Sequence, residues 1–464
     1  MEKIKNKRLQ IIILFILSLL FFGIMASIRG IGEYGDSGQY LTMHIHREPL
    51  YPLWLYMIKM FSGKNIEAGI LLGQCLLAAV CTTYYCSYII TRFKLKIMGG
   101  MVIWGITLVP HIITPLISES GLILTSAILS EAICLPLFLV FLVECHKIMV
   151  DNVKRAVMVS FFLSLLLSLC RGQMMFTIVL WIMIVMSKCI LEKKFNYIVV
   201  SLVMVILFFA IRGYTIKSYN FIFNDRFIGN TYGQVNTLTH VMYASKREMG
   251  EAIEQKEIRE LFYAIYDKME EKGLNDKKDI HSVWEKAIKL EEIHDTLKFD
   301  VVESVLNDYF KEQGIDDYIE RNLYSDEYAS VMIRRILPQC LLEWLCNYFM
   351  LAFRGVIRTV AVVNPIFTTY AIGLLVYLSI DGIMIIKNQR RSSLGWLMMI
   401  SVLTVLGLAF STAFTIMCLS RYMIYGFTGI YTCVALKGSE KLNEYMNNVD
   451  RSVNEKTGQT GTID

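Results

Sequence analysis

A short stretch near the N-terminus holds the residue types that acid–base chemistry needs. Residues 32–40 read Gly-Glu-Tyr-Gly-Asp-Ser-Gly-Gln-Tyr, so Asp36 lies among glycines that let the backbone bend tightly and hold its carboxylate near a substrate. A carboxylate held in this way accepts a proton from an attacking hydroxyl group. Asp36 is therefore a candidate general base, although solvated loop acids are equally common and the stretch alone does not separate the two readings.

The residues around Asp36 extend this candidate site. Residues 44–52 read His-Ile-His-Arg-Glu-Pro-Leu-Tyr-Pro. His44, His46 and Glu48 could bind a divalent metal, but their spacing is loose, and Arg47 beside His46 disfavours a cation. We assign no cofactor and keep a divalent metal as the weaker alternative. The candidate substrate-binding residues of the whole stretch are Glu33, Tyr40, Arg47, Glu48 and Tyr51.

Three further charged residues lie in or beside apolar segments. Glu131 begins an apolar run, Arg171 separates two runs, and Arg421 precedes Tyr422 at the start of the last one. An ionised side chain at membrane depth is costly and is usually functional or paired. The arginines could instead extend to the lipid headgroups. We expect Glu131, Arg171 and Arg421 to meet Asp36 on one membrane face.

The composition indicates what must position these residues. The chain has 464 residues, of which 55% are hydrophobic and 19% are charged, and a water-soluble protein cannot bury that much apolar surface. The eleven cysteines lie in or beside apolar segments, which argues against a disulfide scaffold. The net charge of +5 is small and no basic stripe occurs, so no nucleic-acid partner is expected. The expected fold class is an all-α integral membrane protein embedded in a lipid bilayer.

Apolar runs long enough to cross about 30 Å of hydrocarbon recur along the chain. The segment 336–360 is ambiguous, because it carries Glu343, Arg354 and Arg358, and we expect it to lie on the outer surface. This gives ten spans, or eleven if 336–360 also crosses. The expected spans are roughly 10–27, 67–91, 98–117, 125–145, 156–170, 173–190, 196–214, 366–386, 394–412 and 416–436.

Every second loop between these spans is basic. Because short loops rich in lysine and arginine stay in the cytoplasm, the N-terminus is expected inside and the loops 28–66 and 215–335 outside a cell membrane. Few prolines with abundant isoleucine, lysine and methionine favour a bacterial source.

Four parts of the chain follow from this topology. Residues 1–214 form an N-terminal transmembrane domain, and 336–436 form a C-terminal one that includes the interfacial segment 336–360. Between them, 215–335 is an extracytoplasmic domain with helical periodicity in 248–272 and 282–310, a small helical cap over the membrane portion. Residues 437–464 are a polar cytoplasmic tail that is expected to be irregular.

The sequence resembles the GT-C superfamily of polytopic glycosyltransferases, which includes protein O-mannosyltransferases and aminoarabinose transferases. The resemblance covers about 1–214 and 366–436. It departs from the family where many members have two adjacent acids, since Glu33 and Asp36 are three residues apart, and 215–335 has no counterpart in it. The resemblance is carried by Asp36 and Tyr40, the run 47–52 (Arg-Glu-Pro-Leu-Tyr-Pro), Ser130 and Glu131, Arg171, and Arg421 and Tyr422.

The resemblance implies a reaction at the outer membrane face. Asp36 would be the catalytic base, the donor would be a sugar on a polyprenyl phosphate, and the acceptor stays open among glycan, lipid and protein. Arg171 and Arg421 would stabilise the departing phosphate, and Glu131 would be a second catalytic residue that positions a substrate or holds an arginine. Tyr422 would join them in substrate binding. A single displacement would invert the anomeric centre.

Two other functions fit a chain of this kind. A transporter or flippase for a lipid-linked or polar substrate would show internal repeats and charges near mid-bilayer, whereas here no repeat occurs and the charges lie near one face. An envelope polysaccharide polymerase or ligase would place key arginines in the large outer loop, which does contain Arg226, Arg247 and Arg259.

Overall fold

The computed structural model describes residues 2–117, 121, 123–151, 154–231, 233–275, 282–414 and 416–457. These residues are 84% helical and contain no strand, which confirms the expected all-helical architecture. Nine of their helices are long and apolar enough to cross a membrane. On α9 (Asn196–Asn224), side chains such as Val199, Val203 and Ile206 are exposed, and an apolar surface of this kind suits a lipid environment. The protein is a multi-pass membrane protein.

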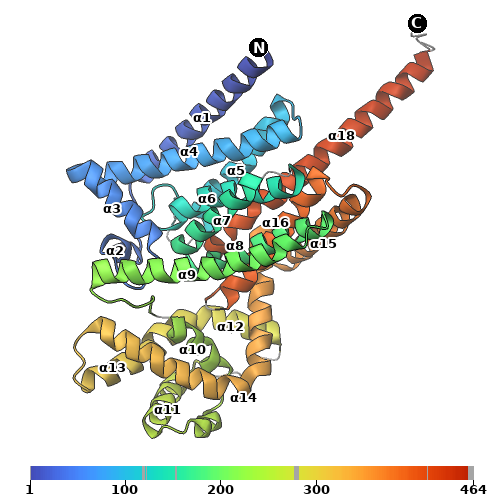
Figure 1. Ribbon diagram of the computed structural model, residues 1–464. Coiled ribbons are helices and arrows are strands. Elements are labelled where there is room, and N and C mark those ends of the chain that lie inside the picture. The colour runs from blue at the N-terminus through green and yellow to red at the C-terminus, as the bar shows by residue number, and fades with distance from the viewer. Residues whose placement is uncertain are drawn as a thin grey trace.

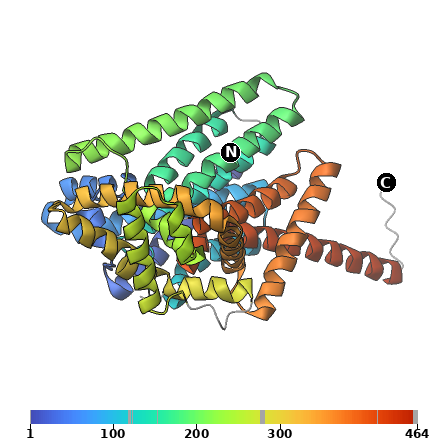
Figure 2. The same cartoon turned by 90° about the horizontal axis from the view of Figure 1, so that it is seen from below.

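Residues 2–224 form the first part of the bundle. Helix α6 is largely buried within the bundle. By contrast, α9 lies along one flank and is largely exposed (Figure 2). The elements are α1 (Glu2–Arg29), α2 (Ser37–Leu41), α3 (Leu50–Ser62), η1 (Gly63–Asn65), α4 (Ile66–Arg92), α5 (Ile97–Ile117), α6 (Glu131–Val150), α7 (Lys154–Cys170), η2 (Gly172–Met175), α8 (Phe176–Leu191) and α9 (Asn196–Asn224).

A helical cap follows α9 and lies at one end of the bundle, opposite both chain termini (Figure 1). Its boundary was expected at 215, but α9 continues to Asn224. The cap elements are α10 (Gly233–Ala244), η3 (Arg247–Ala252), α11 (Lys256–Glu271), α12 (Val283–Asp295), the π-helical segment η4 (Thr296–Glu303) and α13 (Ser304–Glu312). Residues 276–281, which belong to the expected outer domain, lie outside the described residues.

Helix α14 (Tyr318–Val360) joins the cap to the rest of the bundle. It bends near Cys340, whose backbone is non-helical and follows Pro338, because a proline removes one helical hydrogen bond. Its first half lies in the cap and its second half runs towards the bundle (Figure 1). Glu291 of α12 binds Arg354 and Arg358 of the second half, with N–O distances of 2.6 Å each.

The chain ends with α15 (Pro365–Asn388), α16 (Ser393–Ala413), α17 (Ser420–Met423), η5 (Ile424–Gly426) and α18 (Phe427–Thr457). The expectation of an irregular tail from 437 is wrong as far as Thr457, because α18 continues through these charged residues and projects from the bundle (Figure 1). Lys437 stabilises this extension through ion pairs of 3.1 Å with Asp381 and with Glu440. Residues 458–464 lie outside the described part.

The expected spans agree with the structure in most places. Eight of the nine long apolar helices coincide with them, and the ninth is α14, whose 336–360 region was expected at the surface. The two remaining expected spans, 156–170 and 416–436, are not among these nine helices. Helix α7 is short, with 17 residues, and α18 becomes charged after Leu436. The expected span 125–145 begins as a helix only at Glu131, because the preceding residues form turns.

The basic loops meet at one end of the bundle. Arg92, the last residue of α4, binds Asp151, just after α6, at 2.5 Å, and its Nε donates to Ser393 at the start of α16 at 2.6 Å. Arg391 and Glu192 connect the α15–α16 and α8–α9 turns at 3.4 Å. These contacts place four basic loops, far apart in sequence, on the same side, as a common cytoplasmic face requires.

Candidate functional site

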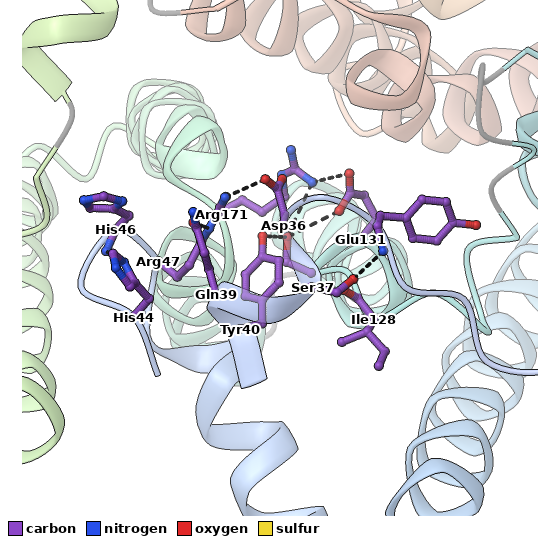
Figure 3. Close-up of polar contacts among 12 residues, drawn as sticks. Asp36, Ser37, Gln39, Tyr40, His44, His46, Arg47, Ile128, Glu131 and Arg171 are labelled. Carbon is purple, nitrogen blue, oxygen red and sulfur yellow. Dashed lines mark hydrogen bonds and ion pairs between the residues drawn. The ribbon is translucent and has the colours of Figure 1, made fainter. Parts of the chain in front are cut away.

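The loop that carries Asp36 is fixed to the segment before α6. The Gly32 N–H donates to the Ser126 carbonyl at 2.8 Å, and the Ile128 N–H donates to the Gly32 carbonyl at 2.9 Å. The Ser37 hydroxyl donates to the Ile128 carbonyl at 2.9 Å (Figure 3). The motif glycines Gly32, Gly35 and Gly38, all among the described residues, do not have a positive φ. Gly30, directly after α1, does, with a φ of 66°. The loop is thus held by strand-like pairing, with Asp36 preceding α2.

Four charged side chains follow one another across this site. Arg47 Nη2 lies 2.6 Å from Asp36 Oδ1, and Arg171 Nη1 lies 2.5 Å from Glu131 Oε1. In the view of Figure 3 the order is Arg47, Asp36, Arg171 and Glu131, so positive and negative groups alternate. The Asp36 side chain is 39% exposed, whereas that of Glu131 is 3% exposed. The Asp36 carboxylate is therefore accessible to solvent, whereas Glu131 is buried and pairs with Arg171.

Tyr40 supports this row from α2. Its ring lies under the Arg47 guanidinium at 5.0 Å, and its hydroxyl donates to Ser130 Oγ at 3.2 Å. Arg171 also donates to Ser130 Oγ, at 3.4 Å. Burial raises the pKa of Tyr40 to about 12, so its hydroxyl stays protonated and keeps its role as a donor. Tyr40 and Ser130 thereby connect the two ion pairs.

A second guanidinium lies beside Arg171. The Tyr422 ring is flanked by Arg171 at 4.9 Å and by Arg421 at 4.7 Å, and Arg421 donates to the Tyr422 hydroxyl at 2.6 Å. Within the described residues, no carboxylate lies at ion-pair distance from Arg421, and its buried Nε has no hydrogen-bond partner. The charges of Glu131 and Asp295 attract Arg421 at longer range, so it is a partly buried cation whose guanidinium can still take an anion as a direct partner.

One cavity of about 1400 Å³ connects these groups. Its polar end lies between the bundle and the cap. From there an apolar arm extends between helices α8, α9 and α16. The residues of this arm are Ile178, Val179, Leu180, Met183, Phe209, Leu403, Leu406 and Phe410. A polar chamber with an apolar arm fits an amphipathic molecule with a charged head and a hydrocarbon tail.

Glu48 forms an ion pair that the sequence analysis did not anticipate. It lies 2.5 Å from Arg212 of α9, and both side chains are largely buried. Burial raises the pKa of Glu48 to about 7, and the charge of Arg212 opposes that shift. An arginine inside an otherwise apolar span was the signal that could have identified Arg212, because such a residue needs a partner.

The histidines of the loop contact the cap. The ring of His46 lies 5.9 Å from that of Tyr318, and its Nε2 lies 3.2 Å from Asn322 Nδ2. Burial lowers the pKa of His46 to about 3, and the charge of Arg47 contributes to the shift. The described residues contain no group of three histidine, cysteine or acidic side chains that could hold a metal ion. These residues have other partners: the imidazoles of His44 and His46 pack at tilted and edge-on angles against the Tyr318 ring, and Glu48 binds Arg212.

The structure brings most of the candidate residues together. Three of them lie elsewhere: Glu33 is exposed outside the cavity, His44 packs against His46 without lining it, and Tyr51 is fully buried, where its hydroxyl donates to Gln74 at 2.8 Å. Glu131 lies behind the cavity wall, next to Arg171. The candidate residues that line the cavity are Asp36, Tyr40, His46, Arg47, Glu48, Arg171, Arg421 and Tyr422.

Several lining residues were missed by the sequence analysis. Gln39 accepts a hydrogen bond from Arg47 Nε at 2.7 Å, and Gln173 donates to the Tyr422 carbonyl at 3.3 Å. The cap adds a larger group. No local pattern marks these residues, because only the packing of cap on bundle brings them to the site. The lining residues from the cap are Gly233, Asn236, Glu291, His294, Asp295, Lys298, Phe299, Glu303 and Tyr318.

Comparisons of the chain with protein-family models, with curated proteins and with solved structures find nothing similar. The function must therefore be argued from the geometry of the site.

Proposed function

We propose that this protein is a membrane glycosyltransferase that moves a sugar from a polyprenyl phosphate to an acceptor at the outer membrane face. The observation that carries the proposal is the single cavity that joins Asp36 and Arg421 to an apolar arm between α8, α9 and α16. A polyprenyl chain would lie in that arm, with its phosphate at Arg421 and its sugar towards Asp36. A GT-C glycosyltransferase is the class that the loop acid and the arginines resemble.

The reaction follows from the positions of the charged groups. The acceptor oxygen attacks the anomeric carbon while Asp36 takes its proton, and Oδ2 is suited to this role because Oδ1 is bound to Arg47. The bond from the anomeric carbon to the phosphate oxygen breaks, and its electron pair leaves with the polyprenyl phosphate. The cation of Arg421 stabilises the charge that grows on this phosphate. One displacement inverts the anomeric centre.

Arg171 has a different part from the one expected from sequence. Its charge is already balanced by Glu131 at 2.5 Å, and its guanidinium is held by Ser130 and the Tyr422 ring. It therefore positions Tyr422 and offers its remaining N–H groups to the phosphate, while Arg421 supplies a charge that no carboxylate of the described residues contacts directly. Glu131 acts through Arg171, as a positioning residue.

The transporter alternative needs a path to the other membrane face. The residues that line the cavity come from the cap end and from the middle of α8 and α16. The opposite end is closed by contacts such as Arg92–Asp151 and His146–Ser393. No specific observation favours transport over transfer.

The test is a transfer assay with the full chain in lipid nanodiscs and a panel of radiolabelled polyprenyl-phosphate hexoses and pentoses. Asp36→Asn should lower turnover of the active donor by about 100-fold or more, because the variant cannot accept the proton. Glu33→Gln is the matched control: it changes an acid of the same loop outside the cavity and should stay within about 2-fold of wild type.

Turnover by Asp36→Asn at the wild-type rate would overturn the assignment of the base. Mass spectrometry of envelope glycans from cells with and without the gene would then identify the sugar and its carrier. Unchanged glycans, together with no donor turnover by the wild type, would overturn the whole proposal.

A further inference from the structure

The cap contributes a row of side chains to the cavity. Glu291, Asp295, Phe299 and Glu303 are spaced four residues apart, and all four line it. Together with His294, Lys298 and Tyr318 they form what we call the roof, which faces the Asp36 loop and the arginines across the cavity. The proposed transfer reaction gives these residues no role.

The second half of this row has an unusual backbone. Thr296–Glu303 is π-helical, with hydrogen bonds from residue i to i+5 in place of i to i+4, and it directly continues α12, which ends at Asp295. Side chains four residues apart stay near one face in both kinds of helix. Such segments are rare and occur frequently at functional sites. This one directs Phe299 and Glu303 to the same face as Asp295.

Asp295 is the most accessible acid of the roof. Its side chain is 85% exposed, and its Oδ1 lies 2.9 Å from His294 Nδ1. The hydrogen bond from His294 is the main cause of a lowered pKa, so Asp295 is a carboxylate at neutral pH. His294 itself is buried, with its ring 5.4 Å from that of His240. The carboxylate is thus held in place from behind and accepts hydrogen bonds from the cavity.

The two sides of the cavity differ in charge. Arg171 and Arg421 lie on the membrane side, whereas Glu291, Asp295 and Glu303 belong to the roof, where Arg354 and Arg358 neutralise Glu291 and Lys298 is a further cation. Burial raises the pKa of Glu303 to about 7, so near neutral pH it is partly protonated and can donate a hydrogen bond. The arginines of the membrane side attract a phosphate, whereas the roof, with its charges largely balanced, offers carboxylates that accept hydrogen bonds from hydroxyl groups.

Two aromatic rings complete the roof. Phe299 is 49% exposed and Tyr318 is 40% exposed, and both line the cavity. Lys298 Nζ lies over the Phe299 ring at 4.4 Å, and His46 contacts the edge of the Tyr318 ring, so each ring is covered in part and offers its exposed remainder. An exposed aromatic surface beside carboxylates suits a pyranose ring, because the C–H face of a sugar packs on it and its hydroxyls donate to the acids.

We propose that the roof is the acceptor site and that the acceptor is a carbohydrate. Its ring lies on Phe299 and Tyr318, and Asp295 accepts hydrogen bonds from its hydroxyls. The nucleophilic hydroxyl is thereby directed across the cavity towards Asp36. This inference rests on the proposed transfer function and adds to it the class of acceptor.

The experiment uses the full chain in nanodiscs with the donor that gives Asp36-dependent turnover. Methyl glycosides and short oligosaccharides are compared with serine- and threonine-containing peptides as acceptors. Asp295→Asn should raise the KM for the glycoside acceptor by about 10-fold or more, because it weakens hydrogen bonds to a charged group, while the donor KM changes by less than about 2-fold. Asp300→Asn is the matched control, since Asp300 is an exposed acid of the same π-helical segment outside the cavity.

The outcomes separate the two proposals. Asp36-dependent donor turnover that peptides accelerate and glycosides do not, or an Asp295→Asn variant whose acceptor KM matches that of Asp300→Asn, overturns the acceptor assignment and leaves the transfer function standing. Absence of Asp36-dependent donor turnover in the wild type overturns both. A rise in the glycoside KM for Asp295→Asn alone supports the roof as the acceptor site.

Discussion

The two ends of the membrane bundle use charge differently. At the end where the basic loops meet, ion pairs such as Arg92–Asp151 and Lys188–Glu192 connect helix ends. At the other end arginines are paired as well, as in Arg171–Glu131, but the charges surround a cavity, and no carboxylate of the described residues contacts Arg421. Paired charges fasten helices together, whereas a cation left without a partner beside a cavity is available to a ligand. This difference supports the proposal that the cavity end is the functional one.

The largest expected effect concerns a paired charge at the functional end. Arg171→Met leaves Glu131 buried without its guanidinium, and breaking a buried pair from one side costs about 3–5 kcal/mol. We expect a large drop in the melting temperature of the detergent-solubilised protein. The double variant Arg171→Met/Glu131→Leu should recover much of it, because an apolar pair replaces the ionic one. If wild type and Arg171→Met were equally stable, Arg171 would not be the structural arginine of this end, and the distinction between it and Arg421 would be wrong.

A smaller effect is expected at the unpaired cation, and in activity only. Arg421→Gln should lower transfer by about 100-fold, because the growing charge on the phosphate loses its stabilising donor. Stability should change by less than about 1 kcal/mol, since no carboxylate is left behind. The transfer activity of Arg421→Lys should lie between those of wild type and Arg421→Gln, because lysine keeps the charge and loses the forked geometry. Transfer and melting assays on the same preparations check this, and full activity of Arg421→Gln would break the comparison.

The smallest effect is expected at the opposite end. Arg92→Gln removes a partly exposed pair with Asp151, and pairs of this kind contribute less than about 1 kcal/mol. Transfer should stay within about 2-fold of wild type, as measured in the same assay. An activity loss as large as that of Arg421→Gln would show that the basic end takes part in function, in addition to holding the helices together.

The sequence predicted the membrane helices well because their signal is local. A run of apolar residues long enough for a bilayer indicates a span whatever its neighbours are, and α4, α5 and α16 begin and end within a residue or two of the expected limits. The distance over which a helix continues was harder to predict. The helix α14 and the helical part of 437–457 depend on tertiary contacts, such as Lys437 with Asp381, that hydropathy does not register.

The site was predictable only in part for the same reason. Asp36, Arg171 and Arg421 were recognisable because a charge beside an apolar segment stands out. Their partners were not: nothing in the sequence assigns Arg47 to Asp36, or Arg171 to Glu131. Tyr51 was expected to bind substrate because of its neighbours, yet its place behind Tyr40, with ring centroids 5.0 Å apart, makes it a support. The roof needs the π-helical turn and the docking of the cap, and no local pattern encodes either.

Helix α14 has a consequence for changes in chain length. Because one helix runs from the cap into the bundle, each residue inserted between Cys340 and Val360 would turn one part against the other by about 100° and shift it by about 1.5 Å. Such a turn would carry Asp295 away from Asp36 and pull Glu291 from its two arginines. This stretch should therefore accept many substitutions while tolerating no insertion or deletion, and a cap grafted from elsewhere would work only when the helical phase is kept.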